Sequence, residues 1–339
     1  MARRNALERH SMREVSPRGT RLAELARHML SEFAGLRAGE RVLILAETEG
    51  AEGVKRAFYR AAREAAGENV SMAIYDRRPA YTHPPEPLPA AVAEADLVIC
   101  LDIYLSHTKL EQSARAAGTR FFNLHPARFA ALRRAVLGVD YREIRRRGRE
   151  LARLFGAGRR GLITCPRGSH LEFEIDAGRE VSIGSGYARK PGDYATLPNG
   201  KIKVPVVRAS MTGTFVVNGV IIPPINELSE LVTLRFNNSR LVDISGGAEA
   251  KAYMRFLESF NDPSMYVLDH LTFGFNPRAT LSQPPPPAFS SEAEKVMGCV
   301  NIGLGRAGLK GKQHTDVVSV GTTVVVDGRP VIIKGRYTI

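Results

Sequence analysis

The stretch Arg41-Val42-Leu43-Ile44-Leu45-Ala46 decides the fold of the first half of this chain. Its unbroken apolar run is typical of a strand that is covered on both faces, as the strands of parallel sheets are. Similar runs follow at residues 70–75, 96–101 and 119–124, and the segments between them have helical spacing of apolar residues. This alternation predicts a Rossmann-like, doubly wound α/β domain over residues 38–158, preceded by a helical segment over residues 1–37.

From residue 159 onward the pattern changes to short β-type segments with turn residues between them. They lie at residues 161–164, 171–175, 202–207, 213–217 and 231–236, and one amphipathic helix is predicted from about residue 248 to 260. We therefore expect a second, mostly antiparallel β-rich domain over residues 159–339. The predicted fold class is α/β plus α+β, with any metal site in the second domain.

Composition narrows the class of protein. The 339 residues are 44% hydrophobic and 24% charged, as in ordinary globular proteins. No apolar run approaches the about 18 residues of a membrane span, and no apolar segment of a secretory signal follows the basic N-terminus. Three cysteines without close spacing favour a reducing cytoplasm. The net charge is +13, but the sequence contains no nucleic-acid-binding motif. An anionic small substrate is therefore the preferred explanation of the charge.

Two histidines and one aspartate form the strongest candidate site. His270 is followed 44 residues later by His314, and Asp316 stands two positions beyond it. Residues i and i+2 of a strand project from the same face, and the β-branched residues after Asp316 predict a strand there. Two imidazoles and one carboxylate are the facial triad that holds Fe(II) and leaves open positions. The alternative is a chance pattern in which a buried histidine serves only the core.

No glycine-rich phosphate loop follows the first predicted strand, so a dinucleotide site is not supported. In open α/β sheets, functional groups lie beyond the carboxyl ends of the strands. His107 falls just beyond such an end, close to Tyr104. It is either a functional residue or an ordinary loop histidine.

Several motifs in the second half resemble one enzyme family. They are Phe260-Asn261-Asp262-Pro263, His270 with Gly274 and Pro277-Arg278-Ala279, His314-x-Asp316, Gly246-Gly247-Ala248-Glu249-Ala250, and Gly186-Tyr187-Ala188 with Pro191-Gly192. Together they resemble 2,5-dihydroxypyridine 5,6-dioxygenases, which are non-haem Fe(II), ring-opening enzymes. The resemblance implies the fold of the distantly related aminopeptidase T-like metallopeptidases, an assembly of identical subunits, and a substrate pair of a hydroxylated aromatic ring and O2.

The resemblance also implies roles for individual residues. His270, His314 and Asp316 correspond to the iron ligands, and His107 to an acid/base histidine. Arg278 is a candidate partner for an anionic group of the substrate, or else a structural arginine of the turn after Pro277. Tyr104 and Tyr187 are weaker candidates for lining the substrate pocket.

The chain departs from both families at specific positions. Gly184 and Thr196 replace a glutamate and a histidine of the dioxygenases, which leaves the identity of the ring open. Lys201 stands where the peptidases have a metal-binding glutamate, and we expect no second such glutamate near Cys299. The alternative to a dioxygenase is therefore a metal-dependent aminopeptidase-type hydrolase that lacks part of its ligand set, and a third possibility is a scaffold that has lost its metal.

Overall fold

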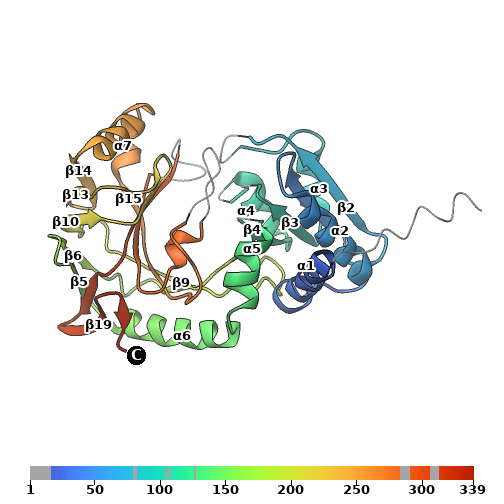
Figure 1. Ribbon diagram of the computed structural model, residues 1–339, viewed down its shortest axis with the longest axis horizontal. Coiled ribbons are helices and arrows are strands. Elements are labelled where there is room, and N and C mark those ends of the chain that lie inside the picture. The colour runs from blue at the N-terminus through green and yellow to red at the C-terminus, as the bar shows by residue number, and fades with distance from the viewer. Residues whose placement is uncertain are drawn as a thin grey trace, which may run out of the picture.

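The computed structural model describes residues 17–78, 82–103, 105–106, 108–125, 127–282, 291–305 and 313–339. Within these residues the chain forms one parallel and two antiparallel sheets, with helices gathered mainly around the parallel sheet (Figure 1). Two of the predicted site residues, Tyr104 and His107, lie outside the described residues. No described helix is long and apolar enough to cross a membrane.

The parallel sheet has the strand order β2-β1-β3-β4-β8, and each of its neighbouring strands runs parallel to the next. Its strands are β1 (Val42–Glu47), β2 (Val70–Tyr75), β3 (Leu97–Leu101), β4 (Arg120–Leu124) and β8 (Tyr194–Leu197). The strand predicted from the opening stretch is its β1, whose six residues are all buried. This parallel sheet confirms the expected mixed α/β architecture. A parallel sheet needs cover on both faces.

Helices cover both faces of this sheet. Ile44 of β1 packs in one core with residues of α1 (Pro17–His28) and α2 (Glu52–Ala66). Leu45, the next residue, packs in a second core with residues of α3 (Leu88–Glu94) and α4 (Lys109–Ala116). Alternate side chains of one strand therefore enter two separate cores, as the period of two requires. The designation of this layer as Rossmann-like stays a prediction.

The edge strand β8 comes from beyond residue 158, where the first domain was expected to end. Between β4 and β8 lie the short helix α5 (Phe129–Leu132) and the longer helix α6 (Tyr141–Ala157), which connects the two halves. The first half also contains two short π-helical turns, at Met29–Phe33 and Arg133–Leu137. Figure 1 shows α6 running beneath the molecule from the parallel sheet toward the antiparallel sheets. The domain boundaries stay a prediction, and β8 ties the second half to the first.

The second half is antiparallel, as expected. One sheet has the order β14-β13-β10-β6-β5-β18-β19-β20, and the other has the order β12-β11-β17-β16-β15-β9-β7. The strands of the first are β5 (Arg160–Thr164), β6 (His170–Glu174), β10 (Thr212–Val217), β13 (Val232–Asn237), β14 (Arg240–Gly246), β18 (Thr323–Val326), β19 (Arg329–Ile333) and β20 (Arg336–Tyr337). The strands of the second are β7 (Ser182–Gly184), β9 (Lys201–Val204), β11 (Val220–Ile222), β12 (Asn226–Glu227), β15 (Leu268–Gly274), β16 (Val300–Leu304) and β17 (Thr315–Ser319).

The predicted helix near residue 248 is α7 (Ala248–Glu258), which packs on β13 and β14. Two 3-10 turns, Pro263–Tyr266 and Ala293–Lys295, precede and follow strand β15 in sequence. Strand β9 ends at Val204, because the following Pro205 has no N–H to donate to a neighbouring strand. The four consecutive prolines at residues 284–287 lie outside the described residues.

Helix α6 supports the seven-stranded sheet through a close contact at Gly148. A Cβ placed there would lie 2.6 Å from Cγ2 of Ile183 on β7 and 3.3 Å from Cζ of Phe275. At Gly156 of the same helix, the nearest atom to such a Cβ is 3.9 Å away, on Val181. Only the first glycine is therefore required by helix–sheet packing.

We expect Gly148→Ala to be less stable than Gly156→Ala by about 1–3 kcal/mol, the usual effect of overpacking. The same substitution in the same helix gives both variants a similar gain in helix propensity. Urea unfolding of the two variants beside the wild type measures the difference. Equal midpoints would contradict the close packing of α6 on β7.

Candidate functional site

A cavity of about 560 Å³ lies between the carboxyl ends of the parallel strands and one face of the seven-stranded sheet. The parallel sheet contributes the last residues of β1 and β2, Glu47 and Tyr75, and the residues that directly follow β3 and β4, Asp102 and His125. This is the edge at which open α/β sheets place their ligands. The seven-stranded sheet contributes the opposite wall, which includes His270, His314 and Asp316.

His270 and Asp316 meet across three neighbouring strands. Their positions on β15 and β17 are both paired with Gly303 of the intervening strand β16. A Cβ at Gly303 would lie 2.4 Å from Cε1 of His270, so the imidazole lies directly over this glycine. The ring can therefore cross β16, and its Nε2 reaches 3.1 Å from Oδ1 of Asp316.

His314 completes the group from the other side of the same carboxylate. Its Nε2 lies 3.3 Å from Oδ2 of Asp316, and its ring stacks on that of His270 with centroids 5.0 Å apart. Both histidine side chains are 10% exposed and that of Asp316 is 19% exposed. The structure thus brings together the three residues that the sequence singled out, with two imidazole nitrogens directed at one carboxylate.

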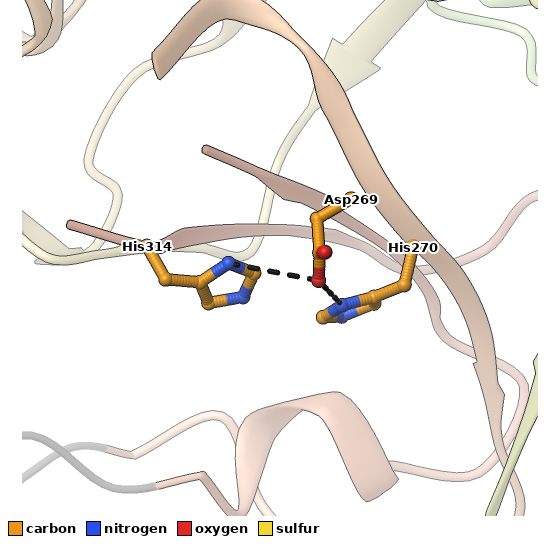
Figure 2. Close-up of side chains that lie close together, drawn as sticks. All are labelled: Asp269, His270 and His314. Carbon is orange, nitrogen blue, oxygen red and sulfur yellow. Dashed lines mark hydrogen bonds and ion pairs between the residues drawn. The ribbon is translucent and has the colours of Figure 1, made fainter. Parts of the chain in front are cut away.

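Asp269 orients the first of these histidines. Its Oδ2 lies 2.8 Å from Nδ1 of His270 and 3.9 Å from Nδ1 of His314, and Figure 2 shows this carboxylate between the two rings. A carboxylate beside Nδ1 holds the ring proton there, which leaves the Nε2 lone pair free to bind a cation. The sequence analysis did not single out Asp269, although it directly precedes His270.

Charge interactions keep the acidic groups ionised. Burial alone would raise the pKa of Asp316, but the charge of His314 and hydrogen bonds from both histidines hold this pKa well below its usual value. Burial lowers the pKa of His314, but the charge and hydrogen bond of Asp316 outweigh it and raise that pKa.

Glu294 is a carboxylate that the sequence analysis missed. One of its oxygens lies within 4.8 Å of ligand atoms of both His270 and Asp316. The absence of a peptidase-type metal-binding glutamate near Cys299 stays a prediction. Two lysines hold Glu294: Lys201 donates a hydrogen bond to Oε2, and Lys295 donates one of 2.5 Å to Oε1. Burial alone would raise the pKa of Glu294, but Lys201 and Lys295 lower it to about 2.

Lys295 is itself deeply buried, with 1% of its side chain exposed. Its ammonium also donates to the carbonyl of Ser291 at 2.6 Å. Burial lowers its pKa to about 8 in spite of the charge of Glu294. The spacing in sequence gives no sign of this cluster, because Lys201 and Glu294 belong to segments 93 residues apart.

Two overlapping groups of side chains lie close enough to hold a metal ion: Asp269 with His270 and His314, and His270 with Glu294 and Asp316. Two ligands at right angles and about 2.1 Å from one ion are roughly 3 Å apart, close to the separations between Asp316 and each histidine. Asn301 adds an oriented amide, whose Nδ2 donates to Oδ1 of Asp316 at 2.8 Å. The Oδ1 of Asn301 and the Nδ1 of His314 are buried and have no hydrogen-bond partner among the described residues. Nitrogen and oxygen ligands together suit iron, zinc and related metals.

The other predicted site residues lie elsewhere. Arg278 is exposed and outside the described cavity lining, and its carbonyl accepts a hydrogen bond from Arg134. Tyr187 also lies outside that lining, with its hydroxyl 3.3 Å from Glu32 and Arg145 over its ring. These two positions give no support to a substrate contact, which stays a prediction.

The two positions that depart from the dioxygenase pattern do line the cavity. A Cβ at Gly184 would lie 2.3 Å from Oδ1 of Asn199, and Asn199 in turn donates a hydrogen bond of 3.0 Å to Thr196. A glutamate at position 184 would therefore displace Asn199. These departures belong to one rearranged wall of the cavity.

Comparisons with known proteins agree on one group. A curated 2,5-dihydroxypyridine 5,6-dioxygenase of Pseudomonas putida KT2440 is 34% identical over 96 residues, which are 28% of this chain and 27% of that protein. The solved structure of the 2,5-dihydroxypyridine dioxygenase of the same strain superposes with a TM-score of 0.80 at 22% identity, over 94% of this chain and 97% of the other.

A wild-type AmpT of Thermus thermophilus superposes less closely, with a TM-score of 0.67 at 14% identity, over 94% of this chain and 99% of the other. At these identities the two structures establish the shared fold. A family model described as 2,5-dihydroxypyridine 5,6-dioxygenase matches residues 21–339, which is nearly the whole chain. This chain therefore belongs to the 2,5-dihydroxypyridine 5,6-dioxygenase family.

Proposed function

We propose that this protein is a mononuclear non-haem iron dioxygenase that opens a hydroxylated aromatic or N-heteroaromatic ring of the dihydroxypyridine type in an extradiol-like reaction. The observation that carries the proposal is the convergence of Nε2 of His270 and Nε2 of His314 on the carboxylate of Asp316. Family membership supports the reaction class. A cavity of about 560 Å³ supports a small-molecule substrate.

His270, His314 and Asp316 would hold Fe(II), whose bound form supplies Lewis acidity toward a substrate hydroxyl and electrons for the reduction of O2. Asp269 would keep the proton of His270 on Nδ1 and so hold its Nε2 ready. His107, outside the described residues, would accept the proton of a substrate hydroxyl and return it. The cavity wall of the seven-stranded sheet would orient the ring.

The contacts of Glu294 favour a site with one metal ion over a site with two. A dinuclear hydrolase site needs further carboxylates that are free to bind a second cation. Glu294 already accepts hydrogen bonds from Lys201 and Lys295, so a second cation would have to displace two ammonium groups. The competing hydrolase hypothesis is favoured by one observation, the overlap of two possible ligand groups, one with Asp269 and one with Glu294.

The two hypotheses differ in their need for oxygen. We expect the Fe(II)-loaded protein to consume O2 with 2,5-dihydroxypyridine and to release no amino acid from peptides with Zn²⁺ or Co²⁺ under anaerobic conditions. An oxygen electrode and an anaerobic peptidase assay measure the two activities. Peptide cleavage in the absence of O2, together with no oxygen uptake, would replace the dioxygenase by the hydrolase.

We expect His270→Ala, His314→Ala and Asp316→Ala each to abolish Fe(II)-dependent oxygen uptake, because each removes one of three proposed ligands. Iron content after anaerobic reconstitution and desalting gives a readout apart from turnover. His170→Ala is the matched control, since His170 lies on β6 with 65% of its side chain exposed. A His270→Ala protein that retains stoichiometric iron and normal turnover would refute the ligand assignment.

We expect Gly303→Ala to fold normally and to bind Fe(II) about 10- to 100-fold more weakly, on the scale of lost support for a ligand. The added methyl group would occupy the place where the His270 ring crosses β16. Anaerobic titration with a competing chelator measures the affinity, and circular dichroism monitors the fold. Gly156→Ala is the control. Unchanged affinity would mean that His270 does not need this position to bind the metal.

We further propose a cytoplasmic, homo-oligomeric enzyme. Its three cysteines are unpaired in the structure, which suits a reducing compartment. The assembly of identical subunits rests on the family resemblance alone. Light scattering of the purified protein measures its oligomeric state.

A further inference from the structure

The lysines of the cavity differ in what they contact. Lys201 and Lys295 share the carboxylate of Glu294. Lys203 also lines the cavity, and its charge helps to lower the pKa of Asp269, but no hydrogen bond or close ion pair joins its ammonium to any of the residues that the structure describes. A half-buried ammonium without a hydrogen-bonded partner is unfavourable unless water or a ligand compensates it.

Strand geometry places Lys203 beside the proposed metal ligands. Lys201 and Lys203 are two positions apart on β9, so both project to the cavity face while Ile202 and Val204 enter the core. Lys203 is paired with Thr272 of β15, two positions from His270 on the same face. On its other side it is paired with Ser182 of β7. Both neighbours line the cavity and carry hydroxyl groups.

The charges around the site are balanced before any metal or ligand is added. Three lysines (Lys201, Lys203 and Lys295) and three carboxylates (Asp269, Glu294 and Asp316) line this part of the cavity. The remaining described lining adds two arginines and two further carboxylates. A divalent cation bound at Asp316 therefore leaves an excess of two positive charges in a partly dehydrated space, where such an excess favours a doubly negative ligand.

We propose that Lys203 anchors a carboxylate substituent of the ring substrate, so that the preferred substrate class is a dihydroxylated aromatic or N-heteroaromatic carboxylic acid. This inference rests on the proposed function, since it needs a ring hydroxyl bound at the metal. One negative charge is then the deprotonated hydroxyl, and the second is the carboxylate at Lys203, with the hydroxyls of Ser182 and Thr272 beside it. The cavity has room for a substituted ring.

The test is anaerobic calorimetry of the Fe(II)-loaded protein with catechol and with 3,4-dihydroxybenzoate, which differ only in a carboxylate remote from the chelating hydroxyls. We expect the wild type to bind the acid about 10- to 100-fold more tightly, as a charge-assisted hydrogen bond provides. Lys203→Met should abolish this preference, because it lowers the affinity for the acid far more than the affinity for catechol. Lys203→Arg should retain most of it, and Lys251→Met, an exposed lysine of α7, should retain all of it.

Two results would overturn the anchor. One is equal affinity of the wild type for catechol and the acid, and the other is a full preference for the acid in Lys203→Met. Neither result affects ring cleavage itself, because oxygen uptake with the uncharged 2,5-dihydroxypyridine tests that separately. If the wild type shows no oxygen uptake but still prefers the acid over catechol in a manner that depends on Lys203, the anchor stands and the dioxygenase proposal is refuted.

Discussion

The contact between His270 and Asp316 depends on an absent side chain. One strand, β16, separates their backbones, and only a glycine at position 303 allows an imidazole to lie across it. The stacking of His314, the contact of Asn301 Nδ2 with Nε2 of His270 and the orienting contact of Asp269 all depend on that position of the ring. The register of β15, β16 and β17 is therefore the constraint from which the rest of the site follows, because a shift of one residue would turn these side chains to the core.

The two walls of the cavity come from two kinds of sheet. The antiparallel sheet holds Asp269, His270 and Asp316 on strands, where neighbouring backbones fix them rigidly, and His314 directly precedes β17. The parallel sheet offers the residues at the ends of its strands, including Asp102 and His125, to the opposite wall. Lys201 and Lys295 neutralise the carboxylate of Glu294, and Lys203 adds a further positive charge to the cavity. The electrostatic character of the cavity thus depends on the lysines of β9 as well as on the proposed metal ligands.

The sequence predicted the features that depend on local periodicity. Buried apolar runs indicated the parallel strands, and the i, i+2 spacing placed His314 and Asp316 on one face. The features it missed depend on strand register, which no local pattern encodes: Gly303 beneath His270 and Glu294 between two lysines. Arg278 was singled out for its chemistry, but the turn after Pro277 directs it to the surface. Strand β8 escaped prediction as part of the first sheet because its sequence neighbours belong to the second half.

That strand has a consequence for how such a protein can evolve. The chain leaves the seven-stranded sheet after β7, adds β8 to the edge of the parallel sheet beside β4, and returns as β9. The two halves are consequently interwoven rather than arranged as modules in series. Exchange of either half with that of another protein would expose the polar backbone edge of β4 and remove the connection that sets Lys201 and Lys203 against the cavity. New specificity in this architecture is therefore accessible by substitution within the shared walls and not by recombination of whole domains.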